Sequence, residues 1–505
     1  MTIYNINFGI GWASSGVEYA QSYRAQMLRH LKEDAKFIFL DFIASENIQT
    51  LTANLGFQDN EVIWLYQYFT DIPIAPTTYT IDQLKHDVGN TVTRTEVDQQ
   101  GKVQRLYLDH QPQTFVTCYM KNADQPYVDR AEFVVNGMLI RKDFYSYVRV
   151  FSEYYAPYDN YAKLYMRQFY NENGSIAYQE IIDGDAHSYV FNDARFDSKE
   201  AFVAYFIQQL HLTHNDIVIL DRATDIGQAV LLNKGQSHVG VVVHAEHYSD
   251  NITDGTHILW NNYYEYQFNH APYIDFYIVA TDLQNQILSQ QFAQYTKFQP
   301  RIRTIPVGSL DQLTMPSVER QPYSILTASR LASEKHVDWI ALAVIKAKQA
   351  VPQLSFDIYG HGPEKDKIQQ IISDHHADDY IHLQGHVNLD EIYIQYELFV
   401  SASQSEGFGL TLMEAVGSGL GMIGFNVNYG NPTFISDGQN GYLLDKPTKE
   451  ESIEEITDRM ADQIVRYFNN GPTSPQQVSY DIATPFKTTE MINKWQNLVD
   501  EVLYD

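Results

Sequence analysis

The stretch that decides the fold is LFVSASQSEGFGLTLMEAVGSGL, residues 398–420. It opens with a short apolar run that is typical of a strand covered on both faces of a sheet. Gly407 and Gly409 then allow a backbone to approach a ligand closely, and a helical period begins near Leu410. A strand, a glycine loop and a helix in this order direct free N–H groups of the helix N-terminus toward an anion. We therefore predict an anion site at the carboxyl end of this strand.

Short apolar strands of the same kind, separated by helical stretches, lie on both sides of this segment. The neighbouring ones are YSILTAS (323–329), LSFDIYG (354–360), YIHLQG (380–385), GMIGFNV (421–427) and GYLL (441–444). An earlier set comprises DIVILD (216–221), HVGVVVH (238–244), DFYIVAT (275–281) and RIRTIPV (301–307). Two such sets predict two parallel-sheet halves and a crevice at the carboxyl ends of their strands.

The first residues of the chain have the same α/β character. Residues 3–8 form a short apolar strand, which is followed by the glycine loop GIGWASSG (9–16). Ser15 with Glu18 three residues later is the signal of a capping box, and a helix is expected from there. The spacing of this loop is a poor dinucleotide fingerprint. We expect it instead to approach a phosphate or a sugar, with Gly16 nearest to the ligand.

Residues from about 76 to 205 follow a different pattern. Alternating segments rich in Tyr, Phe, Val and Thr are separated by polar glycine turns such as DQQG (98–101) and NENG (171–174). This predicts an antiparallel meander inserted into the first α/β half. Asp183-Gly184-Asp185 lies within the meander and reads as a hairpin turn, not as a metal-binding pair.

These patterns predict five segments. Residues 1–75 and 206–305 would form an N-terminal Rossmann-like domain in two parts, and residues 76–205 would be its inserted meander. Residues 306–485 would form a second Rossmann-like domain. Residues 486–505 would be a final helix that crosses back to the first domain.

Composition excludes several classes of protein. Lys and Arg number 35 and Asp and Glu 63, so the formal net charge is −28. Nucleic-acid binding and docking on anionic lipid both need clustered basic residues, so this balance disfavours them. Cys118 is the only cysteine, which excludes an intrachain disulfide. No signal-peptide pattern and no apolar run of roughly 18 residues is evident, so we expect a cytoplasmic protein.

Two cations follow a strand of the second set. Arg330 and Lys335 occur in TASRLASEKHVD (327–338), between a strand and a helix. Cations near a helix N-terminus oppose the helix dipole, and an anion bound between them would resolve that conflict. Two solvated loop charges are the alternative. The glycine loop at the same sheet edge favours a diphosphate site.

A carboxylate and a histidine are further candidates. Glu414 shares a helical face with Leu410, and a carboxylate on a packing face is uncommon without a partner, so it either binds a ligand or is paired internally. His244 ends a buried strand in VVVHAEHY (241–248) and would face the crevice. A core or capping histidine is the alternative. A metal site formed by His244 and His247 is weakly supported, because their spacing differs from that of a zinc-binding helix.

These residues resemble a known family of enzymes. The R-x4-K pair (Arg330, Lys335) and the E-x7-E pair (Glu406, Glu414) are similar to those of retaining, metal-independent glycosyltransferases of family four, which have two Rossmann-like domains facing a cleft (the GT-B fold). The closer resemblance is to GtfA-type subunits of the accessory-secretion glycosyltransferase. It covers essentially the whole chain and is carried by residues 1–20, HAEHY (244–248), ILWNNYYEYQF (258–268) and residues 405–420. One position departs from the resemblance, because Gly421 stands where many members of the family have proline.

The resemblance implies a role for each candidate. Arg330 and Lys335 would hold the donor diphosphate, Glu414 the ribose hydroxyls, and His244 the donor sugar near its reacting carbon. Glu406 would hold the sugar ring. The remaining donor-binding positions would act mainly through their backbone or the surface they offer: Gly16, Val17, Glu18, Tyr19, Gly385, His386, Val387, Gly407, Phe408, Gly409, Leu410 and Thr411. Uracil would lie at residues 385–387. No metal or other cofactor is expected.

The resemblance also implies an activity and partners. The enzyme would transfer a sugar, N-acetylglucosamine or glucose, from a UDP-sugar to Ser or Thr of an unfolded serine-rich-repeat adhesin before its accessory Sec export. A related, non-catalytic GtfB-type subunit would be its partner, in the cytoplasm or at the inner face of the membrane. One alternative is a poly(glycerol-phosphate) α-glucosyltransferase of wall teichoic acid. Another is a silent, substrate-binding paralogue, which the presence of all four charged residues disfavours.

Overall fold

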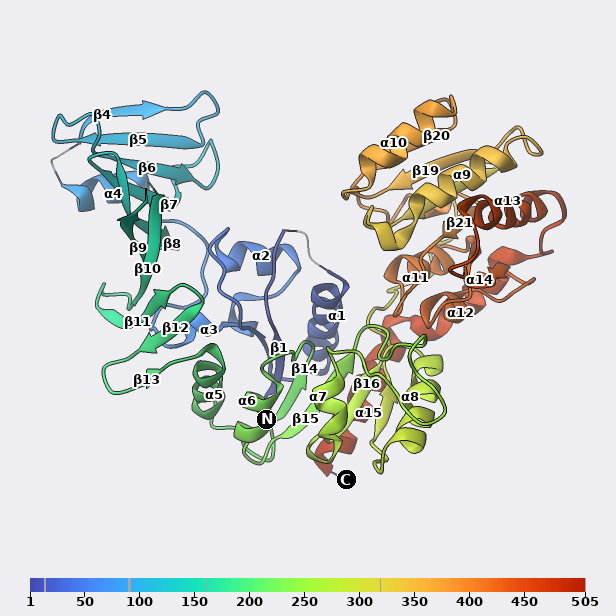
Figure 1. The fold of residues 1–505 in the computed structure, drawn as a ribbon, viewed down its shortest axis with the longest axis horizontal. Helices are drawn as coiled ribbons and strands as arrows, with labels where there is room; N and C mark the ends of the chain where they lie inside the picture. The colour runs from blue at the N-terminus through green and yellow to red at the C-terminus, as the bar shows by residue number, and fades with distance from the viewer. Residues whose placement is uncertain (13–14, 90–91, 160, 318, 505) are drawn as a thin grey trace. The chain divides into compact units, whose positions relative to one another are not determined.

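The computed structural model describes residues 1–12, 15–89, 92–159, 161–317 and 319–504 (Figure 1). Within these ranges the strands form a seven-stranded sheet, a ten-stranded sheet and a six-stranded sheet. The chain divides into two compact units. Unit 1 comprises residues 1–25 and 32–240, and unit 2 comprises residues 26–31 and 241–505.

The seven-stranded sheet has the order β17-β16-β15-β14-β1-β2-β3. The neighbours β14, β1, β2 and β3 run parallel, as do β16 and β17. The strands are β1 (Ile3–Asn7), β2 (Ala35–Phe39), β3 (Val62–Trp64), β14 (Ile217–Leu220), β15 (His238–Val243), β16 (Phe276–Val279) and β17 (Ile302–Thr304). The predicted Rossmann-like strand set is therefore confirmed, and β3 is an addition that the sequence pattern did not indicate.

Helices connect these parallel strands, as crossover connections require. Before the inserted sheet they are α1 (Gly16–Leu31), α2 (Ile48–Asn54), α3 (Leu65–Tyr68) and α4 (Ile81–Val88). After it they are α5 (Lys199–Gln209), α6 (Gly227–Asn233), α7 (Glu265–Asn269) and α8 (Asp282–Tyr295). α4 falls in the range that was predicted to be meander, and its Thr80–Gln83 capping box is the local signal for it.

The inserted segment is a single antiparallel sheet, which confirms the prediction. Its ten strands follow chain order from β4 to β13, as consecutive hairpins do. They are β4 (Val92–Val97), β5 (Val103–Leu108), β6 (Phe115–Met120), β7 (Val128–Val135), β8 (Met138–Tyr145), β9 (Arg149–Tyr158), β10 (Tyr161–Tyr170), β11 (Ile176–Asp183), β12 (Ala186–Val190) and β13 (Arg195–Phe196). Gly184, with φ +63°, turns the chain between β11 and β12, so the Asp-Gly-Asp motif is a hairpin turn.

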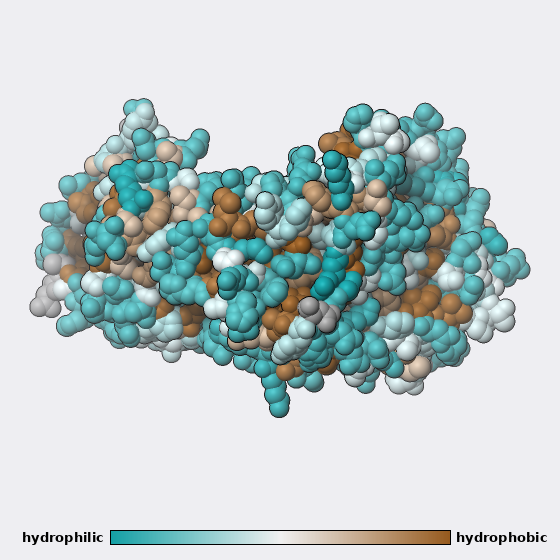
Figure 2. Space-filling model, turned by 90° about the horizontal axis from the view of Figure 1, so that it is seen from below, coloured by the Kyte–Doolittle hydropathy of each residue, from teal (hydrophilic) through white to brown (hydrophobic). Residues whose placement is uncertain are grey.

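Hydrophilic side chains predominate on the face drawn in Figure 2, with hydrophobic ones between them in small groups. Several of the exposed large apolar residues belong to the inserted sheet, among them Tyr158, Tyr161 and Tyr165.

No helix in the described part of the chain is long and apolar enough to cross a membrane.

The six-stranded sheet belongs to unit 2 and has the order β20-β19-β18-β21-β22-β23, all parallel. Its strands are β18 (Ser324–Ala328), β19 (Ser355–Tyr359), β20 (Ile381–Gly385), β21 (Leu398–Ser401), β22 (Gly421–Phe425) and β23 (Gly441–Leu444). Its helices are α9 (Val337–Ala347), α10 (Lys365–Asp374), α11 (Leu410–Gly417), α12 (Gly430–Phe434), α13 (Ile453–Asn470) and α14 (Pro475–Ala483).

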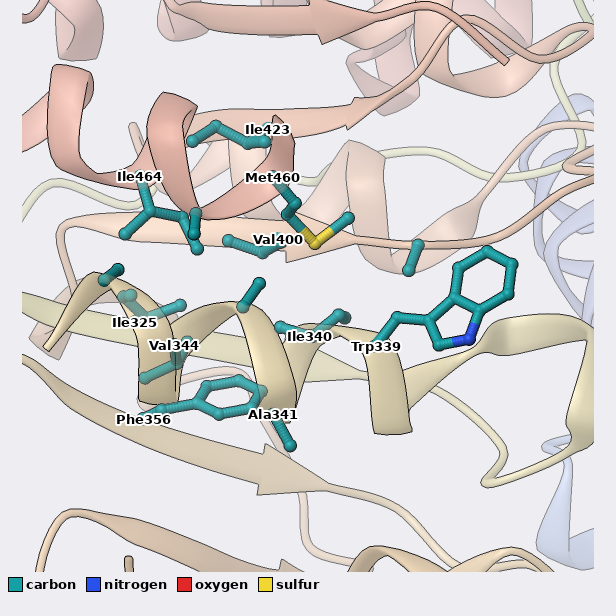
Figure 3. Packing of buried hydrophobic residues seen from close by; sticks show 14 of the residues in the cluster. Ile325, Trp339, Ile340, Ala341, Val344, Phe356, Val400, Ile423, Met460 and Ile464 are labelled. Carbon is teal, nitrogen blue, oxygen red and sulfur yellow. The ribbon is translucent and has the colours of Figure 1, made fainter. Parts of the chain in front are cut away.

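Helices cover both faces of this second sheet, because successive strand residues point to opposite sides. Ile325, Val400 and Ile423 face a core built with α9 and α13, and Figure 3 shows Trp339, Ile340 and Val344 of α9 beside Met460 and Ile464 of α13. The adjacent residues Leu326, Phe399 and Met422 face a second core with α11 and α12. The continuous apolar runs of the sequence are thereby explained.

The final helix, α15 (Thr488–Tyr504), contacts β17 of the seven-stranded sheet. Lys494 donates to the carbonyl oxygen of Thr304 at 3.1 Å. Glu501 forms ion pairs with Arg301 and Arg303. These contacts lie within unit 2 and attach the end of the chain to β17.

Candidate active site

Three loops that carry predicted residues leave the six-stranded sheet at one edge. Residues 329–335 follow β18, residues 386–387 follow Gly385 at the end of β20, and residues 402–409 follow β21. Because all of these strands are parallel, their carboxyl ends meet at the same edge, where α/β sheets bind ligands. The loop after β19 braces the first of them: a Cβ on Gly360 would lie 1.9 Å from the Ser329 carbonyl oxygen.

Lys335 and Glu406 form an ion pair at this edge. Lys335 Nζ lies 2.6 Å from Glu406 Oε2, and each side chain is 18% exposed. Arg330 instead pairs with Glu334 at 3.0 Å and is 68% exposed, so its guanidinium can reorient at little cost. The structure therefore pairs Lys335 with Glu406. Arg330 lies on the same loop as Lys335, and its side chain is in solvent.

The Glu406 backbone is clamped by the segment after β22. Its carbonyl oxygen accepts from the amides of Tyr429 (2.6 Å) and Gly430 (2.7 Å), and its amide donates to Asn428 (3.2 Å). A Cβ on Gly407 would lie 2.3 Å from the His244 carbonyl oxygen. The loop of residues 406–409, the E-G-F-G loop, is thus held on two sides, and only glycine fits at position 407.

Helix α11 begins directly after this loop without a side-chain cap. Its N-cap is Gly409, in the left-handed region at φ +89°. A helix N-terminus carries a partial positive charge, and its first amides point outward along the axis. The amides of Leu410 and Thr411 are therefore suited to a phosphate, and their role in donor binding stays a prediction.

Glu414 lies one turn further along α11 and is mostly buried. Tyr393 donates a hydrogen bond to Glu414 Oε2 at 2.8 Å. Burial raises the pKa of the Glu414 carboxyl to about 7, the Tyr393 bond lowers it, and Asp390 raises it further. Internal pairing, the alternative raised for this residue, therefore holds for one carboxylate oxygen. A carboxyl with a pKa near neutrality at a sheet edge is also typical of functional sites.

His244 is the first residue after β15, and its loop is tightly held. The amide of Ala245 donates to the Tyr264 hydroxyl at 3.0 Å, and Gln284 Nε2 donates to the Ala245 carbonyl oxygen at 3.0 Å. The His244 side chain is half-buried, whereas His247 is completely buried. Among the described residues no group of three or more His, Cys, Asp or Glu side chains could hold a metal ion.

The predicted residues of unit 1 lie at the start of α1. Glu18 is buried and accepts from the Ser15 amide at 2.6 Å, which confirms this half of the capping box. Asn7 donates to Glu18 Oε1 at 3.1 Å, and Arg222 forms an ion pair with it at 3.1 Å. Glu18 therefore holds the loop in place, and its carboxylate points inward. Tyr19 is exposed, and a Cβ on Gly16 would meet no atom within 4 Å.

The predicted uracil segment, residues 385–387, begins at the last residue of β20. Gly385 has φ +76°, and its carbonyl oxygen accepts from the Gly360 amide at 2.8 Å. The side chains of His386 and Val387 are exposed. The main chain of this segment is held at Gly385, and the next two side chains are exposed. This arrangement suits recognition of a base by main-chain groups.

Several residues of the site were not found from the sequence. Tyr393, Gly360 and Gly362 brace Glu414 and the Arg330 loop, and Arg222 completes the anchor of Glu18. The Gly-x-Gly of residues 360–362, directly after a strand, was the available signal for close backbone approach. Tyr393 and Arg222 had no local signal, because their partners lie 21 and 204 positions away.

Comparison with known proteins identifies relatives along the whole chain. The family model "GtfA extended beta-sheet domain" matches residues 96–193, and "Glycosyl transferases group 1" matches residues 316–470. The chain is 53% identical, over 508 residues and 100% of both chains, to the UDP-N-acetylglucosamine–peptide N-acetylglucosaminyltransferase GtfA subunit of Streptococcus pneumoniae serotype 4. The poly(glycerol-phosphate) alpha-glucosyltransferase of Bacillus subtilis is 24% identical over 399 residues, 76% of this chain and 57% of that protein.

Two solved structures match the entire chain at 52% identity. The pneumococcal O-GlcNAc transferase GtfA in complex with UDP and GlcNAc superposes with a TM-score of 0.95 and covers 100% of this chain and 99% of that one. A GtfA/B complex matches with a TM-score of 0.94 and covers 100% of both chains. The sequence-based prediction of a two-Rossmann glycosyltransferase fold is confirmed.

Proposed function

Because the chain belongs to the family of GtfA subunits of UDP-N-acetylglucosamine–peptide N-acetylglucosaminyltransferase, we propose that it transfers N-acetylglucosamine from UDP-GlcNAc to Ser and Thr of a polypeptide. The observation that carries this proposal is the Lys335–Glu406 pair beside the N-terminus of α11. These groups offer a cation, a carboxylate and unpaired helix amides at one sheet edge, which suits a nucleotide sugar.

The leaving group of this reaction is UDP, and negative charge develops on its β-phosphate. Lys335, Arg330 and the first amides of α11 stabilise that charge electrostatically. When the diphosphate binds Lys335, Glu406 no longer neutralises the ammonium and its carboxylate can accept hydrogen bonds from sugar hydroxyls. Glu414 accepts from the ribose, and residues 385–387 contact the base.

The stereochemical course we propose is retention by front-face attack. The acceptor hydroxyl approaches on the side of the leaving phosphate, which accepts its proton as the glycosidic bond forms and the sugar–phosphate bond breaks. His244 lies beside Gly407, at the end of the loop that would hold the sugar ring. Its backbone and half-buried ring would line the reacting carbon.

The acceptor we propose is an unfolded, serine-rich adhesin, glycosylated in the cytoplasm before export. Unit 1 carries the inserted sheet, which the donor chemistry does not need and which matches the GtfA extended beta-sheet domain. A related subunit without the donor-binding charges would assist it. A homologue at 52% identity has been solved as a GtfA/B complex, which supports such a partner.

The test is a matrix of donors and acceptors. The chain, with and without a co-expressed GtfB-type subunit, is incubated with UDP-GlcNAc or UDP-glucose and with a Ser-rich peptide or a glycerol-phosphate polymer. We expect transfer of GlcNAc to the peptide. Preferential glucosylation of the polymer would favour the teichoic acid alternative, whose known example is only a distant relative.

A chelator arm of the same assay tests our proposal that no divalent ion is required. Arg330, Lys335 and a helix N-terminus supply the positive charge that a metal would otherwise provide. We expect full turnover in excess EDTA. Activity that is lost in EDTA and restored by manganese would contradict the proposal.

A further inference from the structure

His247 is a completely buried histidine in the loop that follows His244, and the proposed chemistry does not use it. Its Nε2 lies 2.7 Å from Gln291 Oε1 on α8, and its Nδ1 lies 2.8 Å from the Tyr429 hydroxyl. The His247 and Tyr429 rings are stacked with an interplanar angle of 11°. Trp260 and Phe268 pack around the imidazole, so both ring nitrogens are satisfied in an apolar setting.

The partners of the ring determine its tautomer. The carboxamide oxygen of Gln291 can only accept, so His247 Nε2 carries the proton and donates. Nδ1 is therefore the unprotonated nitrogen, and Tyr429 donates to it. Burial lowers the pKa of His247 to about 4, which keeps the ring neutral at physiological pH.

Tyr429 connects this ring to the candidate active site. It is completely buried, and its amide donates to the Glu406 carbonyl oxygen at 2.6 Å. A Cβ on the next residue, Gly430, would lie 2.1 Å from the Phe408 carbonyl oxygen. A shift of Tyr429 would therefore displace the backbone from Glu406 to Phe408 directly.

Helix α8 anchors the other side of the His247 loop. Gln284 donates to the Ala245 carbonyl oxygen at 3.0 Å, and Gln291, two turns later, binds His247. One helix thus fixes both the backbone that touches Gly407 and the ring that holds Tyr429. The position of the E-G-F-G loop relative to α8 is therefore fixed through two separate contacts.

We propose that His247 is a positioning residue for sugar transfer: through Tyr429 it sets where the Glu406 backbone lies, and so how the Glu406 carboxylate meets Lys335 and the donor sugar. The inference rests on the proposed function for its kinetic readout, and on the hydrogen bonds alone for its spectroscopic one. His247 touches none of the reacting groups and does not exchange protons in the reaction.

Two amide substitutions separate the two hydrogen bonds. In His247→Asn the side-chain oxygen replaces Nδ1 and keeps an acceptor for Tyr429, whereas in His247→Gln the amide nitrogen replaces Nε2 and keeps a donor for Gln291. We expect His247→Asn to retain kcat within about threefold. His247→Gln and Tyr429→Phe should each lower kcat about tenfold or more with the donor KM within about twofold, because misplacement of a reacting group affects turnover more than affinity.

A double-mutant cycle adds a readout that general destabilisation would not produce. His247→Gln with Tyr429→Phe should be no worse than either single variant, because both remove the same link. Ile464→Val, in the α9–α13 core of Figure 3, is the control for a small loss of stability that leaves kcat unchanged. Equal losses in the Asn and Gln variants, or additive effects in the cycle, would overturn the proposal.

Ring nitrogen-15 NMR of the wild-type chain tests the geometry independently of turnover. We expect a protonated Nε2 and an unprotonated Nδ1 for His247, with no titration between pH 5 and pH 8. A protonated Nδ1, or a ring that titrates near its ordinary pKa, would overturn the proposal. If the chain used no nucleotide sugar, the proposed function would fail, and the ring signals would still decide whether His247 holds Tyr429 as inferred.

Discussion

Lys335 and Glu406 give the most direct prediction for single residues. Replacing either by Ala removes a charged contact that we place at the leaving diphosphate or the sugar ring, and loss of one such contact costs roughly 10²–10³ in kcat. Each side chain is only 18% exposed, so the partner that remains becomes a mostly buried, unpaired charge, and we expect the melting temperature to fall while the chain still folds. The measurement is kcat at matched folded fraction, with melting temperature as control. Wild-type turnover in either variant would mean that the donor binds elsewhere.

Glu414 predicts how donor affinity changes with pH. Burial raises its pKa to about 7, so the carboxylate that would accept from the ribose forms only as the pH rises through that value. We expect the Kd of UDP-GlcNAc to rise up to about tenfold per pH unit below 7. Calorimetry between pH 5.5 and pH 8.5 measures it. Glu414→Gln should bind more weakly and lose this pH dependence; an unchanged profile in that variant would assign the titration to another group.

The same shift affects stability with a definite sign. Glu414 returns to an ordinary pKa of 4.5 on unfolding, so the folded chain holds more protons between about pH 4.5 and pH 7. The contribution of this group to the free energy of unfolding is therefore fully present below pH 4.5 and is lost as the pH rises through 7. The carboxylate is retained at a cost in stability, which is common at functional sites.

At the scale of elements, β22 packs closely against α13 because Gly421 has no side chain. A Cβ on Gly421 would lie 2.0 Å from the Tyr467 hydroxyl and 2.4 Å from Cζ, and Tyr467 is buried. We expect Gly421→Ala to lower the free energy of unfolding by about 1–3 kcal/mol, because the ring cannot move without disturbing the core. Gly255→Ala is the matched control, since no atom lies within 4 Å of the added Cβ. Equal melting temperatures for the two variants would contradict this account.

The inserted sheet has an apolar core of its own, in which Leu84 of α4 packs with Leu106, Val116 and Val128, and pairs of rings and cations add to it. Arg94, Arg130 and Arg141 lie 4.0 to 4.1 Å from the centroids of Tyr107, Tyr119 and Phe133. Such pairs are worth roughly 0.5–1 kcal/mol each at exposed sites. Nearer the parallel strands, Arg167 of β10 lies 3.7 Å from the centroid of Phe42, which follows β2, and it pairs with Glu153 and Glu180 within the inserted sheet.

At the scale of the whole molecule, the exposed tyrosines of this sheet predict a second binding surface. Tyr158, Tyr161 and Tyr165 are 52%, 55% and 40% exposed on β9 and β10. Replacing all three by Ala should lower transfer to the polypeptide, or its stimulation by the partner subunit, several-fold, because aromatic side chains carry much of the energy of interfaces. Hydrolysis of UDP-GlcNAc in the absence of acceptor should stay unchanged.

Tyr504→Ala is the control for this triple variant, since Tyr504 is 80% exposed at the end of α15, outside the inserted sheet. Unaltered transfer in the triple variant, with full activity of the chain alone, would show that the inserted sheet only supports the rest of unit 1.

The strands followed from the sequence because their signals are local. Apolar runs of four to six residues marked nearly every parallel strand, and alternation marked the hairpins of the insertion. The strand–glycine–helix order placed the start of α11 at Leu410, where the structure has it. Short elements such as β3 and α4 were missed, because three to eight residues carry too little periodicity to stand out.

What the sequence determined by itself was the fold class and the inserted meander, because periodicity and glycine spacing act within a few residues; the donor-binding residues that it indicated stay a prediction. Only the tertiary structure decided how those residues are held. It paired Lys335 with Glu406, turned Glu18 inward against Arg222, set Tyr393 on Glu414 and buried His247 against Tyr429. Each of these contacts joins side chains 21 to 204 positions apart, and no local preference specifies a partner at that distance. Packing of whole elements brings such groups together, and burial then sets their charge.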